Sequence, residues 1–210
     1  MALHVQSEDD DFRIPAAGLQ VIRRNVAHFS RPTAKRAAFL ESAGKPGFQV
    51  LTPHKIYVAG LEDCPVHKDM LSTARRIGWR YLLFQRKEGE EGEGIEVVAA
   101  VELEAKTGSD EARFIRVVQG PAVKATFEIL SSIGDRVKDS EFELRVLQVL
   151  DLNFSGLWFH CYDDREKDFV MPLPPVPDEL KEKTSYSRAE FLPLMEEIAK
   201  KVKAAFLEAP

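Results

Sequence analysis

The residues best suited to chemistry are two that lie far apart in the sequence, Cys64 and His160. Cys64 precedes Pro65 at the predicted start of a helix, where exposed amide groups and the helix dipole favour a thiolate. His160 lies on a predicted strand and is the candidate base for the thiol proton. Glu62 and Asp63 directly precede the thiol, however, and their negative charge raises its pKa. A simpler interpretation of Cys64 is a small apolar residue that fills the helix cap.

The same part of the sequence also has the composition of a zinc site. Cys64 and His67, together with His160 and Cys161, offer two sulfur atoms and two imidazoles. Adjacent residues of a strand point to opposite faces of a sheet, so His160 and Cys161 cannot both reach one ion without a bulge. The sequence therefore predicts no metal site, and no motif in it indicates a cofactor.

One predicted strand carries large side chains on both faces. Within residues 157–162, Trp158, His160 and Tyr162 share one face. If helices leave this face uncovered, the three side chains form a surface for a partner or a ligand. The alternative is a central strand that is buried on both sides. The acids that follow, within residues 163–168, are expected to be solvated in a charged turn.

The composition is that of an ordinary globular chain. The chain has 210 residues and a formal charge of −5, from 29 basic and 34 acidic residues. This balance argues against nucleic acid as the main partner, because phosphate binding usually needs a positive face. No apolar run approaches the roughly 20 residues that cross a bilayer, and the N-terminus lacks the features of a signal peptide. Two cysteines suit a reducing compartment, so we expect a cytoplasmic protein with no membrane contact.

The N-terminal region predicts an arm and two helices. Residues 1–13 include four consecutive acids and are too polar to bury much surface, so we expect a disordered acidic arm. Apolar spacing predicts a helix over residues 16–29 and, after the break at Pro32, a second helix over residues 34–43. This helical pair begins a single α+β domain that we expect to cover residues 14–210.

The next region predicts a strand and a longer helix. The strand is expected over residues 55–59, with a short edge piece before it. The helix is expected from Cys64 to Gly78, with a buried stripe of Met70, Leu71, Ala74 and Ile77.

The rest of the chain shows one order of elements twice, three strands and then a helix. These βββα segments cover residues 80–134 and 141–206. The connectors between strands are short enough for hairpins, and a helix follows only the third strand. We therefore expect an α+β fold, a mostly antiparallel sheet with helices packed on it.

The helices of both βββα segments have recognisable start signals. The first begins at Gly120-Pro121 and is expected to bury Val123, Phe127 and Leu130. The last begins at a capping box formed by Ser187 and Glu190. Its predicted buried face consists of Phe191, Met195, Ile198, Val202 and Phe206.

The function expected from these features is that of a non-catalytic binding or assembly protein. The chain has no Walker glycine loop, no G-x-G-x-x-G, no G-x-S-x-G and no H-E-x-x-H motif. The alternative is a thiol-dependent enzyme with Cys64 as nucleophile and His160 as base. The expected partner is another protein or a second copy of the chain, because the edges of an open sheet must be covered.

Overall fold

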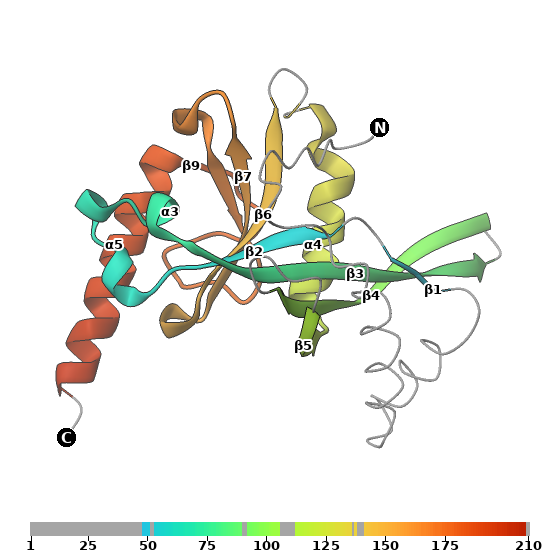
Figure 1. Ribbon diagram of the computed structural model, residues 1–210, viewed down its shortest axis with the longest axis horizontal. Helices are drawn as coiled ribbons and strands as arrows, with labels where there is room; N and C mark the ends of the chain where they lie inside the picture. The colour runs from blue at the N-terminus through green and yellow to red at the C-terminus, as the bar shows by residue number, and fades with distance from the viewer. Residues whose placement is uncertain are drawn as a thin grey trace. The chain divides into compact units, whose positions relative to one another are not determined.

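The described chain is α+β, and its strand pairs are mostly antiparallel, which confirms the predicted class (Figure 1). The computed structural model describes residues 48–50, 53–89, 92–105, 112–135, 137 and 141–208. The predicted acidic arm and the two predicted N-terminal helices lie outside these ranges.

Two compact units make up the described chain. The first unit includes residues 55–76 and 125–208, and the second includes residues 48–54 and 77–124. A single domain over residues 14–210 stays a prediction.

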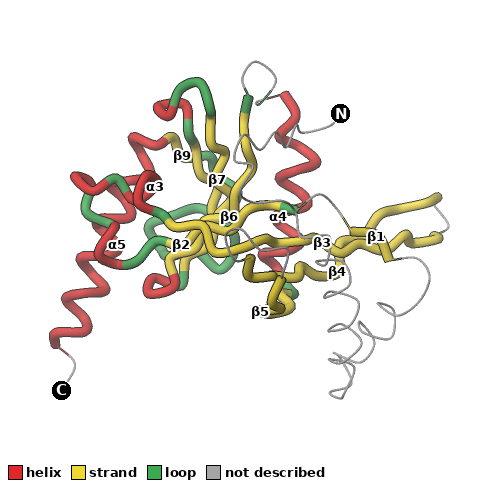
Figure 2. The backbone as a smooth tube through the Cα atoms, in the orientation of Figure 1, coloured by secondary structure: helices red, strands yellow, loops and turns green. Residues whose placement is uncertain are grey.

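The strands described in the first unit pair side by side in a sheet (Figure 2). Their order is β2, β6, β7, β8 and β9; β2 and β6 are parallel, and the other pairs are antiparallel. Their bounds are His54–Val58 for β2, Phe142–Val149 for β6, Phe154–Cys161 for β7, Phe169–Pro172 for β8 and Tyr186–Ser187 for β9. The hairpins between β6, β7 and β8 turn through two short 3₁₀ helices, η4 (Leu150–Leu152) and η5 (Arg165–Lys167).

Helix α5 (Arg188–Glu208) covers one face of this sheet. Leu147, Trp158 and Val170 of the sheet and Phe191 and Met195 of the helix belong to one buried cluster. The capping box at the start of α5 is confirmed, since the Ser187 amide donates to Glu190 Oε2 at 2.9 Å and the Glu190 amide donates to Ser187 Oγ at 3.4 Å. This exchange satisfies amide groups that the first helical turn leaves without partners.

The other face of the same sheet is also buried. Ile56, Val146, Leu157, Phe159 and Met171 are all in the core. Strand β7 is therefore buried on both sides, which is the alternative that the sequence left open for it. A strand without a solvated face can carry the near-continuous run of large apolar residues found here.

Helix α4 (Pro121–Ser132) buries a different stripe from the predicted one. Val123 is buried as expected, but Phe127 and Leu130 are only half-buried. The other buried positions are instead Ala125, Thr126 and Ile129, and Ile133 follows in the 3₁₀ helix η3 (Ile133–Asp135).

The single helix predicted from Cys64 to Gly78 is wrong. The structure has the 3₁₀ helices η1 (Leu61–Asp63) and η2 (Val66–Lys68) and then the short helix α3 (Met70–Thr73). Asp69 has φ of 51°, a left-handed conformation that a continuous helix cannot contain, and Ala74 leaves the helical region at ψ of 130°. Ile77 and Gly78 lie in the next strand, so the predicted stripe combined residues of two elements.

The sheet of the second unit is an antiparallel meander. Its strands are β3 (Arg75–Gly89), β4 (Gly92–Ala105) and β5 (Ala112–Val118), and β1 (Phe48–Val50) pairs with β3. One face of the meander has a buried apolar cluster that consists of Trp79, Tyr81, Leu83, Ala99, Val101 and Leu103.

On the opposite face of this meander, Glu102 lies between two arginines. Arg80 Nε donates to Glu102 Oε1 at 2.9 Å, and Arg116 Nε donates to Glu102 Oε2 at 2.7 Å. Burial acts to raise the pKa of Glu102, but Arg80 and Arg116 outweigh it and the pKa is lowered. The carboxylate therefore stays charged inside the protein and joins all three strands, since each strand contributes one of the three residues.

The position of Gly78 in β3 leads to a stability prediction. A Cβ atom at this position would lie 1.9 Å from the backbone oxygen of Leu103, and a backbone atom in a paired strand cannot move aside easily. We expect Gly78→Ala to lower the free energy of unfolding by about 2–3 kcal/mol, as overpacking does elsewhere. Urea denaturation followed by tryptophan fluorescence measures this change.

Gly134→Ala is the matched control, because a Cβ atom at Gly134 meets nothing within 4 Å. We expect its free energy of unfolding to stay within about 0.5 kcal/mol of the parent protein. Equal effects of the two substitutions would show that Gly78 does not lie in close contact with the neighbouring strand.

Candidate functional site

A buried carboxylate organises the polar side chains of the first unit. Asp168 precedes β8 and accepts three hydrogen bonds: from Trp158 Nε1 at 2.9 Å, from His160 Nδ1 at 3.0 Å and from the Cys161 amide at 2.8 Å. The Nδ1 hydrogen is assigned from this geometry, because a carboxylate is an acceptor. Through these hydrogen bonds, the carboxylate of Asp168 holds the indole of Trp158 and the imidazole of His160 in fixed orientations on β7.

Asp168 is the site residue that the sequence analysis missed. Its position in a charged turn indicated a solvated acid, yet it is buried. The turn itself is as expected, since Asp164 caps η5 by accepting from the Glu166 amide at 3.0 Å. The sequence feature that could have predicted a buried acceptor lies one strand earlier. Trp158 and His160 share a face, and each needs a hydrogen-bond acceptor once it is buried.

Four rings form a ladder along this face. Tyr57 contacts Trp158, Trp158 contacts His160 and His160 contacts Tyr162, each edge to face with centroids 5.4 Å apart. The structure thus brings together the three residues that the sequence proposed as a surface. Exposure increases from 2% for Trp158 and 8% for His160 to 42% for Tyr162, and Tyr57 at the other end of the ladder is half-buried. Of these three, only Tyr162 is available to a partner as a largely exposed ring.

A second carboxylate lies beside the ladder on β6. Glu143 is paired with Lys55 of β2 and with Arg145 of its own strand, and it is the cross-strand neighbour of His160. Burial acts to raise the pKa of Glu143, but Arg145 and Lys55 outweigh it and the pKa is lowered. Burial, followed by the charge of Glu143, raises the pKa of Tyr162 to about 12, so the phenol stays protonated.

Cys64 lies in an environment that disfavours a thiolate. It is the C-terminal cap of η1 and is not at the start of a helix, so the predicted stabilisation by helix amides is absent there. Its thiol donates to the Gly60 carbonyl at 3.6 Å and contacts Met70 Sδ at 3.9 Å. Burial raises the pKa of Cys64 to about 11, and the nearby acids outnumber Lys203, the one cation that lowers it. Neither of these two contacts of the Cys64 thiol involves His160.

Two of the four residues considered for zinc, His160 and Cys161, lie on opposite faces of β7. His160 lies on the face of Glu143, whereas Cys161 points to the opposite face and is fully buried. Both cysteines are free thiols. No group of three or more candidate metal ligands occurs among the described residues.

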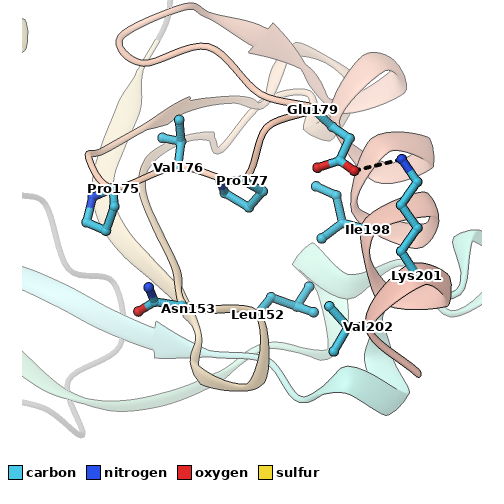
Figure 3. A pocket seen from close by; sticks show the side chains of 9 residues that line it. All are labelled: Leu152, Asn153, Pro175, Val176, Pro177, Glu179, Ile198, Lys201 and Val202. Carbon is cyan, nitrogen blue, oxygen red and sulfur yellow. Dashed lines mark hydrogen bonds and ion pairs between the residues drawn. The ribbon is translucent and has the colours of Figure 1, made fainter. Parts of the chain in front are cut away.

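A pocket of about 250 Å³ lies between α5 and the proline-rich segment that follows β8 (Figure 3). Its apolar side chains come from η4, from the proline-rich segment and from the helix, and Glu179 and Lys201 form an ion pair of 2.7 Å beside it (Figure 3). The full lining is Leu152, Asn153, Pro175, Val176, Pro177, Glu179, Ile198, Lys201 and Val202.

The buried face of α5 is shorter than the predicted one. Phe191, Met195 and Ile198 are buried and Val202 is half-buried, but Phe206 is 72% exposed and Leu207 is 86% exposed. Helical spacing places Phe206 one turn after Val202 on the same stripe. The apolar stripe therefore continues from the core, past the pocket, to an exposed end.

No protein-family model matches the chain, and neither a curated protein nor a solved structure matches it. In the described part of the chain, no helix has both the length and the apolar character needed to cross a membrane. The contacts of the described residues are therefore the basis for assigning a function.

The burial of Cys64 predicts slow alkylation of this thiol. We expect the folded Cys161→Ala variant, in which Cys64 is the one cysteine, to react with iodoacetamide at pH 7 far more slowly than the same chain unfolded in guanidinium. The reason is that a thiol with a pKa of about 11 is on the order of 0.01% thiolate at pH 7. Mass spectrometry over time measures the rates, and rapid modification of the folded protein would support the thiol enzyme instead.

The contacts of Asp168 predict a large effect of Asp168→Asn. The amide nitrogen of asparagine is a donor, so at least one buried donor of β7 loses its acceptor. We expect the free energy of unfolding to fall by about 3 kcal/mol, measured by chemical denaturation.

Asp163→Asn serves as the control, because Asp163 is exposed and lies in the same turn. We expect no measurable change in its unfolding midpoint. If both variants had the same stability as the parent, the carboxylate of Asp168 would not organise the site.

Proposed function

We propose that this is a non-catalytic binding protein that docks an apolar segment of a partner protein on the end of α5 and the adjoining pocket. The supporting observation is that Phe206, at the end of the helix stripe, and its neighbour Leu207 are largely exposed beyond a pocket that α5 helps to form. Burying one such side chain against a partner contributes roughly 1.5–3 kcal/mol. Two exposed neighbours and a pocket together suit a protein interface.

The surroundings of the pocket have the layout of an interface. Its centre is lined by apolar side chains such as Leu152, Ile198 and Val202. Lys201 lies at its edge and pairs with Glu179 at 2.7 Å and with Glu197 at 2.9 Å. An apolar centre with a polar rim is typical of protein interfaces, because the rim can stay hydrated while the centre is dehydrated.

A thiol enzyme is the second candidate, and one observation favours it. The pairing of His160 with Asp168 orients an imidazole in the way that catalytic bases are oriented. Cys64 weighs against this function, since burial suppresses its thiolate and its contacts are Gly60 and Met70. The binding function needs neither residue as a reactant.

Photo-crosslinking from position 206 tests the docking surface. With benzoylphenylalanine in place of Phe206, we expect adducts in the source cells that do not form from position 189, an exposed site near the other end of α5. Val202→Asp should remove these adducts, because it places a charge in the pocket.

The mass of the adduct identifies the kind of partner. A product of twice the 23.7 kDa chain mass indicates self-association, which sedimentation velocity then checks over a concentration series. Any other mass indicates a different protein. Equal adducts from positions 206 and 189, or adducts that persist in Val202→Asp, would contradict the proposal.

A further inference from the structure

The guanidinium group of Arg145 is held as an oriented donor with spare capacity. Its Cζ lies 4.7 Å from the ring centroid of Tyr57 and 4.6 Å from that of Trp158. Its Nε donates to Glu143. Among the described residues, its two terminal nitrogens have no hydrogen-bond partner. Arginine has five N–H donors in a planar fork, so most of this donor capacity is unused.

The acceptors near Arg145 are already engaged. Glu143 is bound by Lys55 and by Arg145 Nε, and it also has a hydrogen bond with Tyr162. Asp168 accepts from Trp158, His160 and Cys161. A partner for the terminal nitrogens of Arg145 must therefore supply a new acceptor. Because the donor is a cation, an anionic acceptor gives the stronger bond.

We propose that Arg145 is the centre of a binding site for a carboxylate group, which enters past Tyr162. A carboxylate matches the planar fork of a guanidinium, with two parallel hydrogen bonds. The stacking on Tyr57 and Trp158 fixes the fork in advance, so little side-chain entropy is lost on binding.

Charge balance selects a carboxylate over a phosphate. Lys55 and Arg145 are the cations of this cluster, and Glu143 and Asp168 are its anions. A carboxylate adds one negative charge to a cluster that is already balanced, whereas a phosphate dianion adds two. The second charge would be repelled by Glu143 and Asp168 without a further cation to offset it.

The approach proposed for the ligand is at the Tyr162 end of the ring ladder, because Tyr162 is the most exposed of the four rings. The Arg145 side chain is 12% exposed, and burial is greatest at Trp158 and least at Tyr162. His160 lies between these two rings, and its Nε2 has no partner among the described residues. The proposed route of the ligand to the guanidinium therefore begins at Tyr162.

Nuclear magnetic resonance of the full chain tests this site directly. The Arg145 Nε–H and the Trp158 Nε1–H signals are followed during titration with sodium acetate, with sodium phosphate, and with sodium chloride at equal ionic strength. We expect saturable shifts of both signals with acetate, weaker shifts with phosphate and none with chloride. A hexaglutamate peptide that saturates the site at a lower concentration than acetate would identify an acidic protein segment as the source of the carboxylate; otherwise a small carboxylate is the ligand.

Two variants separate specific binding from general charge effects. Arg145→Lys keeps the charge but loses the fork, and we expect acetate affinity, read from the Trp158 signal, to fall on the order of tenfold. Arg113→Lys changes an exposed guanidinium that is paired with Glu104, and it should leave the titration unchanged. Equal shifts with chloride, tighter binding of phosphate than of acetate, or unchanged affinity in Arg145→Lys would overturn the proposal. The titration of the wild-type protein tests the proposal even if Arg145→Lys does not fold. Its result does not depend on whether α5 forms a docking surface.

Discussion

The hydrogen bonding of one buried carboxylate, Asp168, is the constraint on which the polar face of the first unit depends. A carboxylate removed from water costs several kcal/mol unless other donors replace its hydration. Here the indole of Trp158, the imidazole of His160 and the amide of Cys161 replace it. Satisfying this one group fixes two side-chain orientations and the end of β7 together. The ring ladder follows from those orientations.

The ion pairs of Glu143 have a related effect on strand register. Lys55 and Arg145 are partners in the parallel pair of β2 and β6, and Glu143 is the partner of His160 in the pair of β6 and β7. A shift of one residue in either pair would move a charged side chain to the apolar face that Ile56 and Val146 occupy. Buried charges of this kind add little net stability, but they disfavour the alternative registers.

The two surfaces proposed for binding have different origins in the first unit. The end of α5 is exposed because the apolar stripe of the helix is longer than the described core that it packs against. The site proposed at Arg145 rests on the stacking of its guanidinium group on Tyr57 and Trp158 and on the pairing of its Nε with Glu143. Neither surface depends on the thiol of Cys64, which packs beside Met70 as a small apolar group.

The sequence by itself determined the elements whose pattern is local. Strands β6, β7 and β8 and the capping box of α5 were predictable, because alternation and capping depend on residues a few positions apart. The helix expected from Cys64 to Gly78 failed because a stripe of Met70, Leu71, Ala74 and Ile77 cannot reveal that Asp69 and Ala74 leave the helical conformation.

Only the tertiary structure decided which side chains are covered and which are not. Phe206 has the spacing of a core residue but is exposed. The sequence could not predict this, because a periodic pattern does not tell how far the surface that covers the helix extends. Asp168 follows a charged turn but is buried. The turn sequence does not indicate this, because the donors that bind its carboxylate come from the neighbouring strand β7. The pairing of β7 with β8 brings Asp168 close to Trp158 and His160, and a pattern of residues a few positions apart cannot predict that contact. For the same reason, the fold class and the shared face of Trp158, His160 and Tyr162 could be inferred from the chain alone, whereas the buried carboxylate of Asp168 could not.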